Sequence, residues 1–146
     1  MDEVTTDGPE IAIRLLAPGD EGVVRELATY EGPGDPEGLL ADPRTLLLVA
    51  FDGEQPVGFV LGYELPRRHG DRSMLFVYEV DIAESHQRRG IASALLGRLA
   101  ELARERGIGV GFVLTEEDNV PAKALYSSAG GTSSRAVMWE FGYAAD

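Results

Sequence analysis

A short polar turn before a long helical pattern holds the residue types that bind anions. Residues 87–92 read QRRGIA, so a glutamine and two arginines precede Gly90 and the small residue Ala92. The first N–H groups of a helix lack internal partners and carry the positive end of its dipole. A glycine there lets a phosphate approach the backbone closely. The pattern predicts an anion site, although an ordinary strand-to-helix connection with exposed arginines would have the same spacing.

Two predicted elements hold this turn. Residues 75–83, LFVYEVDIA, are rich in β-branched and aromatic side chains and predict a strand that ends before the turn. After the turn, apolar residues recur at three- and four-residue spacing from Ile91 to Leu102, which is typical of one buried helix face. Gly107 is expected to end that helix. The sequence therefore predicts a strand, a tight turn and a helix in succession.

Two carboxylates lie in the predicted strand. Glu79 and Asp81 are two positions apart, so a regular strand would place both on the same face. A local β-bulge could separate them. A carboxylate at such a position can accept a proton from a bound group. The other interpretation is a strand whose outer face is simply polar.

Composition indicates one globular domain. The chain has 146 residues, of which 44% are hydrophobic and 26% charged. We expect residues 11–146 to form a single domain and the polar residues 1–10 to be flexible. No apolar run approaches the ~20 residues that span a bilayer, and the N-terminus lacks a signal-peptide pattern. The chain has no cysteine, and His69 and His86 lack metal-ligand spacing, so we expect a cytoplasmic protein without a metal site.

The formal net charge of -12 bears on the kind of partner. It argues against a nucleic acid, because nucleic acids select basic surfaces. An acidic protein attracts cations, so a cationic small-molecule amine is favoured and no membrane partner is expected. The alternative is that the acidity serves only solubility.

The remaining patterns predict further strands and helices around this unit. The Asp52-Gly53 pair is a hairpin turn signal, whereas the glycines and prolines of residues 31–37 predict a loop. The strand after Gly107 is expected to lie parallel to the strand at 75–83, because a right-handed crossover joins them. The expected strands are 11–16, 45–51, 56–65, 109–115 and a final antiparallel strand at 134–143; the expected helices begin near Asp20, near Leu39 and at Pro121.

Two motifs resemble those of a known family. Residues 87–92 resemble the Q/R-x-x-G-x-G/A signature of the GNAT superfamily of acyl-CoA-dependent N-acetyltransferases. Residues 119–130, NVPAKALYSSAG, resemble that family's second motif, N-x-x-A-x-x-L-Y-x-x-x-G, and follow the first in the family's order. The resemblance implies an α/β GNAT fold, a mixed central β-sheet flanked by helices, with acetyl-CoA as cosubstrate and no metal.

Residues 39–92 are more specifically similar to aminoglycoside 3-N-acetyltransferases of the gentamicin-modifying type. They share a tyrosine–acid pair on the strand, here Tyr78 and Glu79, and the His86 position, and residues 121–126 match as well. This similarity implies transfer of an acetyl group to the 3-amino group of an aminoglycoside, by direct attack in a ternary complex. Two alternatives stay open: an acetyltransferase for another amine (a polyamine, a small metabolite or a protein amine), and a non-catalytic acyl-CoA-binding sensor.

The resemblance also implies catalytic roles. Glu79 is the expected base or amine ligand, with Asp81 as the second choice, because an ammonium must lose a proton before it attacks a thioester. A backbone N–H near Val80 or Ile82 would stabilise the developing oxyanion. Tyr126 is the expected acid for the leaving thiolate, unless it only packs against its neighbours.

The same resemblance implies two sets of binding residues and leaves a homodimer open. Asn119 either bonds the pantetheine arm or caps the following helix. Trp139 and Phe141 are expected in the core or at a dimer interface. The expected cofactor-binding residues are Val80, Ile82, Gln87, Arg88, Arg89, Gly90, Ile91, Ala92, Asn119 and Tyr126. The expected substrate-binding residues are Tyr30, Glu31, Asp35, Glu79, Asp81, Glu116, Glu117 and Asp118.

Overall fold

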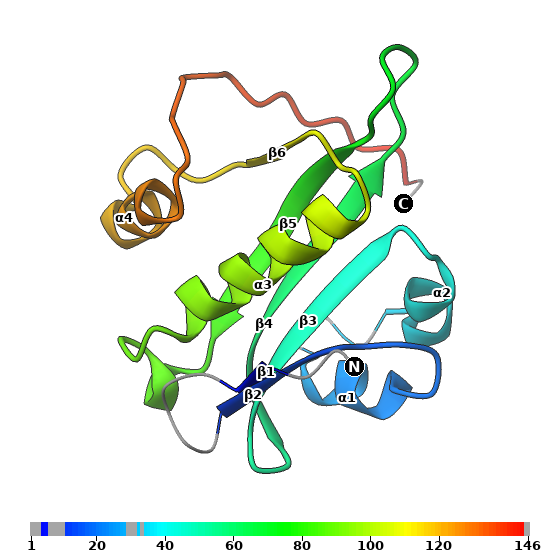
Figure 1. Ribbon diagram of the computed structural model, residues 1–146, viewed down its shortest axis with the longest axis vertical. Helices are drawn as coiled ribbons and strands as arrows, with labels where there is room; N and C mark the ends of the chain where they lie inside the picture. Colours follow the sequence, from blue (N-terminus) through cyan, green and yellow to red (C-terminus); the bar gives the residue numbers. More distant parts are fainter. Residues whose placement is uncertain (1–3, 6–10, 29–31, 33, 145–146) are drawn as a thin grey trace.

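Six strands form one mixed sheet in the order β1-β2-β3-β4-β5-β6 (Figure 1). The computed structural model describes residues 4–5, 11–28, 32 and 34–144. Neighbouring strands are antiparallel except β5 and β6, which are parallel. This confirms the expected α/β class, a mixed sheet flanked by helices. The strands are β1 (Val4–Thr5), β2 (Ile11–Leu15), β3 (Thr45–Asp52), β4 (Gln55–Leu65), β5 (Met74–Ile82) and β6 (Val110–Val113); the helices are α1 (Glu21–Glu26), α2 (Pro36–Ala41), the 3-10 turn η1 (Glu84–His86), α3 (Ile91–Glu105) and α4 (Val120–Ser128).

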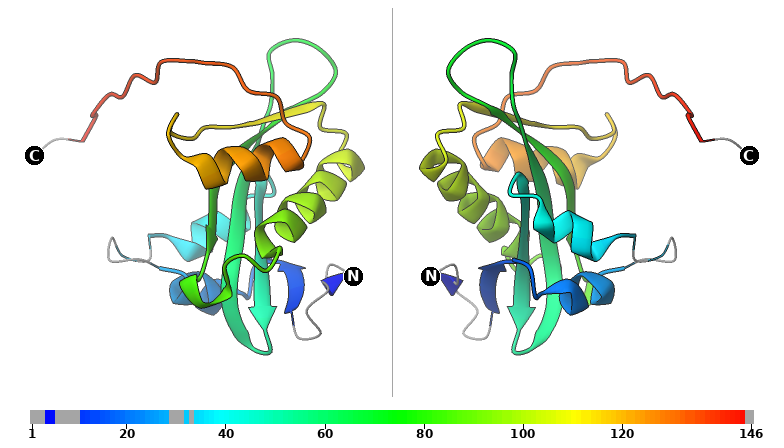
Figure 2. Two further views of the ribbon diagram at one scale, coloured as in Figure 1. Left: turned by 90° about the vertical axis from the view of Figure 1, so that its left-hand side faces the viewer. Right: turned by 90° about the vertical axis from the view of Figure 1, so that its right-hand side faces the viewer.

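Helices cover both faces of the sheet (Figure 2). On one face, α3 buries Ile91, Leu95 and Leu99 in a core that it shares with β2 to β5. On the other face, α1 and α2 pack over a second core that contains Leu40 and Leu61. Burying one such aliphatic side chain contributes about 1.5–3 kcal/mol, so the predicted apolar face of α3 fixes the helix and the turn before it.

A β-bulge interrupts the pairing of β4 with β5. The register runs from Phe59 opposite Asp81 to Leu61 opposite Glu79, and then shifts so that Gly62 stands opposite Val77. The bulge therefore lies on the N-terminal side of Glu79, and the two carboxylates remain in a regular segment. They share one face of the sheet, so the expectation that a bulge could separate them is wrong.

Strand β5 keeps its parallel neighbour over only its first half. The pairs with β6 run from Met74–Val110 to Val77–Val113. From Tyr78 to Ile82, β5 is paired with β4 alone among the residues that the structure describes. In a β-strand the backbone N–H and C=O groups point alternately to the two sides, so this half of β5 also presents groups to the side away from β4.

The N-terminal half of the chain differs from expectation at two places. Helix α2 begins inside the stretch predicted as a loop, because Pro36 suits the first helical position and Asp35 caps it. Within the segment expected to be flexible, Val4–Thr5 pairs with β2. The predicted hairpin is confirmed, since β3 and β4 meet at a turn that contains Gly53. No helix in the described ranges is both long enough and apolar enough to cross a membrane.

The final strand expected at 134–143 is wrong. Residues 132–144, here called the C-terminal arm, form no helix or strand and lead away from the sheet (Figure 2). The apolar side chains of the arm are exposed, including Trp139 at 78% and Phe141 at 71%, so neither lies in the core. Alternating apolar residues satisfy the local pattern of a strand, but a strand also needs a neighbour that supplies hydrogen bonds. Strand β6 is likewise shorter than the predicted 109–115.

Candidate active site

The turn before α3 has the backbone shape of an anion site. Gly90 is the N-cap, with φ +79°, and Arg88 is also left-handed, with φ +63°. No side chain in the described part of the chain caps the helix, and its first i→i−4 bond runs from the Ala94 N–H to the Gly90 carbonyl, 3.0 Å. The preceding N–H groups of α3 are thus directed out of the helix end, where the helix dipole favours negative charge.

The predicted anion-binding residues come together at this turn. The Gln87 side-chain amide donates to the Ile82 carbonyl at 3.1 Å and so fixes the turn to the end of β5. Arg88 and Arg89 are exposed, which leaves two guanidinium groups beside the helix end. Ile91 is buried in the core, so only its backbone can contribute to a site.

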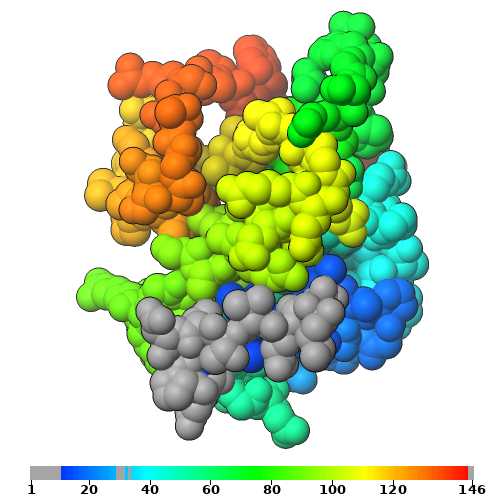
Figure 3. All heavy atoms as spheres, in the orientation of Figure 1, coloured from blue at the N-terminus to red at the C-terminus, as the bar shows by residue number. Residues whose placement is uncertain are grey.

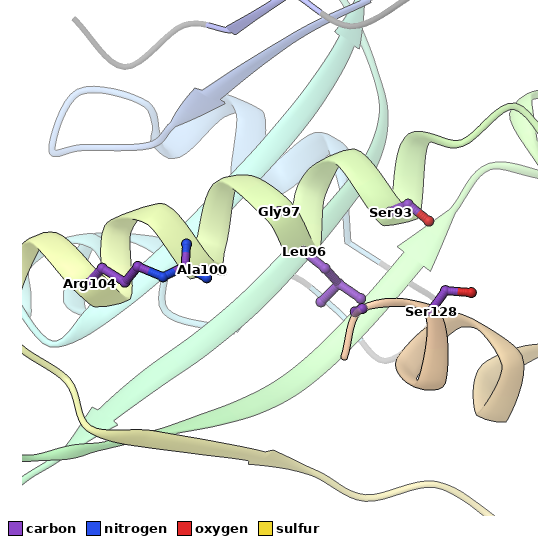
Figure 4. Close-up of a pocket in the computed structure, with 7 residues that line it drawn as sticks. Ser93, Leu96, Gly97, Ala100, Arg104 and Ser128 are labelled. Carbon is purple, nitrogen blue, oxygen red and sulfur yellow. The ribbon is translucent and has the colours of Figure 1, made fainter. Parts of the chain in front are cut away.

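A cleft of about 240 Å³ lies between α3 and α4. The two helices lie next to one another on the same surface of the molecule (Figure 3). The Ser93 and Ser128 hydroxyls come from the two helices at one end of the cleft, and Arg104 stands at the other end (Figure 4). A Cβ added at Gly97 would meet nothing within 4 Å, so this glycine keeps the floor of the cleft open. The cleft runs along α3, the helix that begins at the predicted anion site.

Helix α4 brings Asn119 and Tyr126 to this side of the sheet. The Asn119 carboxamide oxygen accepts from the Ala122 N–H at 3.1 Å, so the capping alternative is the one that the structure shows. Tyr126 is half-buried, and burial raises the pKa of its hydroxyl. The hydroxyl therefore keeps its proton at neutral pH and can act as a proton donor.

A second cavity, of about 470 Å³, opens on the other face of the sheet under α1 and α2. Glu79 reaches it from β5 and Asp35 from the start of α2, so two carboxylates stand in a largely apolar wall. The described lining consists of Val24, Leu27, Ala28, Gly32, Gly34, Asp35, Leu39, Leu47, Phe59, Leu61, Tyr63 and Glu79. An apolar cavity with a few placed carboxylates suits a cationic small molecule.

Tyr63 belongs to this cavity although no sequence pattern singled it out. Its ring meets Tyr78 edge to face, with centroids 5.8 Å apart. Burial raises the pKa of Tyr63, and the negative charges of Glu79 and Tyr78 raise it further. The sequence could not reveal this neighbourhood, because the bulge decides which β4 residues share a face with Glu79.

The other acidic residues expected to bind substrate are placed differently. Asp35 lines the cavity and also caps α2 by accepting from the Gly38 N–H at 3.1 Å. Asp81 is exposed and does not line the cavity. Residues 116–118 do not line it either, and Glu117 instead pairs with Arg135 at 3.2 Å. Tyr30 and Glu31 lie outside the described residues. Within the described ranges, no three His, Asp or Glu side chains are grouped as metal ligands would be.

This arrangement defines a class of protein: an α/β domain that can hold an elongated anion along α3 and a cation on the opposite side of β5. The chain belongs to the acetyltransferase (GNAT) family, whose model matches residues 15–130. The expected family is thereby confirmed.

Similar proteins carry the names of different acceptors. Streptothricin acetyltransferase of Streptomyces lavendulae is 28% identical over 131 residues, which are 88% of this chain and 66% of the relative. The crystal structure of an aminoglycoside acetyltransferase from an uncultured soil metagenomic sample has a TM-score of 0.78 and 26% identity, covering 92% of this chain and 99% of its own. Ribosomal-protein-alanine N-acetyltransferase from Brucella melitensis biovar Abortus 2308 has a TM-score of 0.74 and 26% identity, covering 90% and 99%. This chain therefore spans just under two thirds of the streptothricin enzyme and nearly all of the two solved structures.

Proposed function

We propose that the chain transfers the acetyl group of acetyl-CoA to the 3-amino group of an aminoglycoside, by direct attack in a ternary complex. One observation carries the proposal: Glu79 lines the cavity of about 470 Å³ under α1 and α2, here called the acceptor cavity. It also lies in the part of β5 beyond the last pair with β6. An amine in the acceptor cavity and a thioester beside this part of β5 would meet near Glu79.

The residues of the chain fit acetyl-CoA, which supplies an activated acetyl thioester when bound. The uncapped start of α3, with Arg88 and Arg89, suits the pyrophosphate. The cleft between α3 and α4 suits the remainder of the nucleotide. The backbone of β5 beyond its last pair with β6 suits the amides of the pantetheine arm, and this part of the strand contains Val80 and Ile82.

The chemistry needs a base, an oxyanion donor and an acid. Glu79 accepts a proton from the ammonium, so that the neutral amine forms the new C–N bond while the C–S bond breaks. A backbone N–H near Val80 or Ile82 stabilises the negative charge that develops on the thioester oxygen. Tyr126 gives its proton to the leaving thiolate and takes up the second proton that the nitrogen loses as the amide forms, so the tyrosine is restored.

Charge supports a cationic acceptor. The chain carries a formal net charge of -12, and Asp35 and Glu79 bring carboxylates to the cavity itself. Tyr63 adds an aromatic ring, whose face attracts ammonium groups. An aminoglycoside offers several ammonium groups on an otherwise neutral carbon frame. The similarity to a soil-derived aminoglycoside acetyltransferase supports this choice.

A protein amine is the second candidate. The Brucella ribosomal-protein-alanine N-acetyltransferase has the same identity to this chain, 26%, as the aminoglycoside enzyme. A cavity of about 470 Å³ could also receive the first residues of an extended peptide.

The release of coenzyme A tests the proposal. Acetyl-CoA is offered with gentamicin, a neomycin-type aminoglycoside, spermidine and a peptide with an N-terminal alanine, and the product is mapped by NMR. We expect acetylation of gentamicin at the 3-amine, and Glu79→Gln should lower kcat about 100-fold or more. Asp81→Asn is the matched control, since Asp81 lies on the same strand but outside the cavity, and should retain activity.

Each other outcome selects a different conclusion. Acetylation of the peptide alone would replace the aminoglycoside by a protein amine. Equal losses in the two variants would remove Glu79 from the role of base. Binding of acetyl-CoA without turnover of any amine would favour the non-catalytic sensor.

A further inference from the structure

His86 connects the anion-binding turn to a distant part of the fold. Its Nε2 lies 2.8 Å from Oδ2 of Asp52, a residue 34 positions earlier that ends β3. Its Nδ1 lies 2.7 Å from the Ser85 hydroxyl oxygen. With the hydrogen on Nε2, the ring donates to the Asp52 carboxylate and accepts from Ser85, so both ring nitrogens are used.

The bond lies partly out of water. The side chains of His86 and Asp52 are 16% and 31% exposed. A hydrogen bond to a carboxylate in such a position is stronger than one on the open surface. Backbone bonds support the same junction, since the Ala83 N–H donates to the Val57 carbonyl at 2.8 Å and the His86 N–H to the Ala83 carbonyl at 2.9 Å.

The turn that follows has a conformation that needs support. Arg88 holds φ +63°, which costs a non-glycine residue free energy, and Arg88, Arg89 and Gly90 are all exposed. Among the described residues, two side-chain hydrogen bonds join residues 84–90 to a strand. Gln87 bonds to Ile82 of β5, and His86 bonds to Asp52 of β3. Asp52 follows a segment of β3 that is buried from Leu46 to Phe51.

We propose that His86 and Asp52 are positioning residues: their bond holds the turn in the left-handed form that receives the pyrophosphate of acetyl-CoA. The inference rests on the proposed acetyl-CoA site and adds a determinant of affinity outside the binding motif. Neither residue lines the cleft or the cavity, so the bond acts on the binding of acetyl-CoA and leaves the chemical step unchanged.

A calorimetric titration of the full chain with acetyl-CoA, together with steady-state kinetics, tests the proposal. His86→Ala and Asp52→Ala should each raise the Kd and KM for acetyl-CoA about three- to tenfold, the worth of one such hydrogen bond, with kcat changed less than about twofold. The double variant should bind no more weakly than either single variant. Asp52→Asn keeps a hydrogen-bonding partner for the ring and should restore most of the affinity.

The matched control is a similar link at the other end of α3. Arg106 Nη1 lies 3.2 Å from Glu64 Oε1, which joins residues 42 positions apart. Arg106→Ala should lower stability without changing the Kd for acetyl-CoA. Amide hydrogen exchange in the ligand-free protein should speed up at residues 87–93 in His86→Ala, and not in Arg106→Ala.

The outcomes separate the positioning role from the proposed function. If the wild type binds no acetyl-CoA, the proposed function and the positioning role are both wrong. If the wild type binds acetyl-CoA and His86→Ala binds it equally well, only the positioning role is wrong. An equal rise of Kd in Arg106→Ala, or a loss confined to kcat, also overturns it, because general loosening or a catalytic role would then explain the effect. If His86→Ala folds poorly, Asp52→Ala removes the same bond from the hairpin side, and its Kd supports or overturns the positioning role.

Discussion

Glycine at position 90 offers a direct test of the anion site, because a second glycine serves as its matched control. Gly90 and Gly107 stand at the two ends of α3 with φ +79° and +72°. A Cβ at either position would meet nothing within 4 Å. Alanine therefore introduces no clash at either end, and its effect comes from the left-handed backbone alone.

The two variants should lose free energy in different measurements. A left-handed alanine costs about 1–2 kcal/mol, and the stiffer unfolded chain offsets about 0.4–1 kcal/mol of this. Gly107→Ala should lower the free energy of unfolding by about 1 kcal/mol and leave the Kd for acetyl-CoA unchanged. In Gly90→Ala the exposed turn can leave the left-handed form in the free protein, so less of the cost should appear in the free energy of unfolding. Restoring the left-handed form on binding should instead raise the Kd for acetyl-CoA about five- to 30-fold.

Urea unfolding and calorimetric titration with acetyl-CoA measure the two quantities. Gly90→Asn is a second control, since asparagine tolerates the left-handed region, and it should bind more tightly than Gly90→Ala. An equal rise of Kd in Gly90→Ala and Gly107→Ala would refute the reasoning, because the effect would then be general. So would an unchanged Kd in Gly90→Ala.

Further predictions follow from burial and from the two tyrosines. Tyr126→Phe should lower kcat about 100-fold or more while the Kd for acetyl-CoA stays within about twofold; an unchanged kcat would leave Tyr126 a packing residue. Burial first, and then Glu79 and Tyr78, raise the pKa of Tyr63. The neutral hydroxyl is therefore favoured in the folded state, and its contribution to stability is fully present below about pH 10 and is lost as the pH rises further. Urea unfolding at alkaline pH should show this loss, and the loss should be smaller in Tyr63→Phe. In Glu79→Gln, absorbance titration should show the pKa of Tyr63 moving part of the way back, since burial remains. Leu95→Ala removes a fully buried side chain and should lower the free energy of unfolding by about 3–4 kcal/mol; a loss below about 1 kcal/mol would contradict the packing of α3. Trp139, the one tryptophan, is exposed, so its emission should match that of free tryptophan; a blue shift at high protein concentration alone would show that a homodimer covers the arm.

The sequence by itself determined the local elements and the turn between β5 and α3. Apolar residues at helical spacing from Ile91 to Leu102 predict α3, and the structure buries that face. Asn119 before Pro121 predicts a helix start, and the carboxamide does cap α4. Patterns of this kind are readable because the energies that produce them act between neighbours a few residues apart.

Only the tertiary structure decided which residues line the cavity under α1 and α2, and which distant residue bonds to the segment before α3. The bulge before Glu79 sets the register with β4 and brings Tyr63 beside it, and Asp52 reaches His86 across 34 residues. The arm shows the converse, since its alternating residues predict a strand that no neighbour among the described residues completes. Register, long-range contacts and strand pairing depend on the packing of segments far apart in the chain, and no local pattern contains that information.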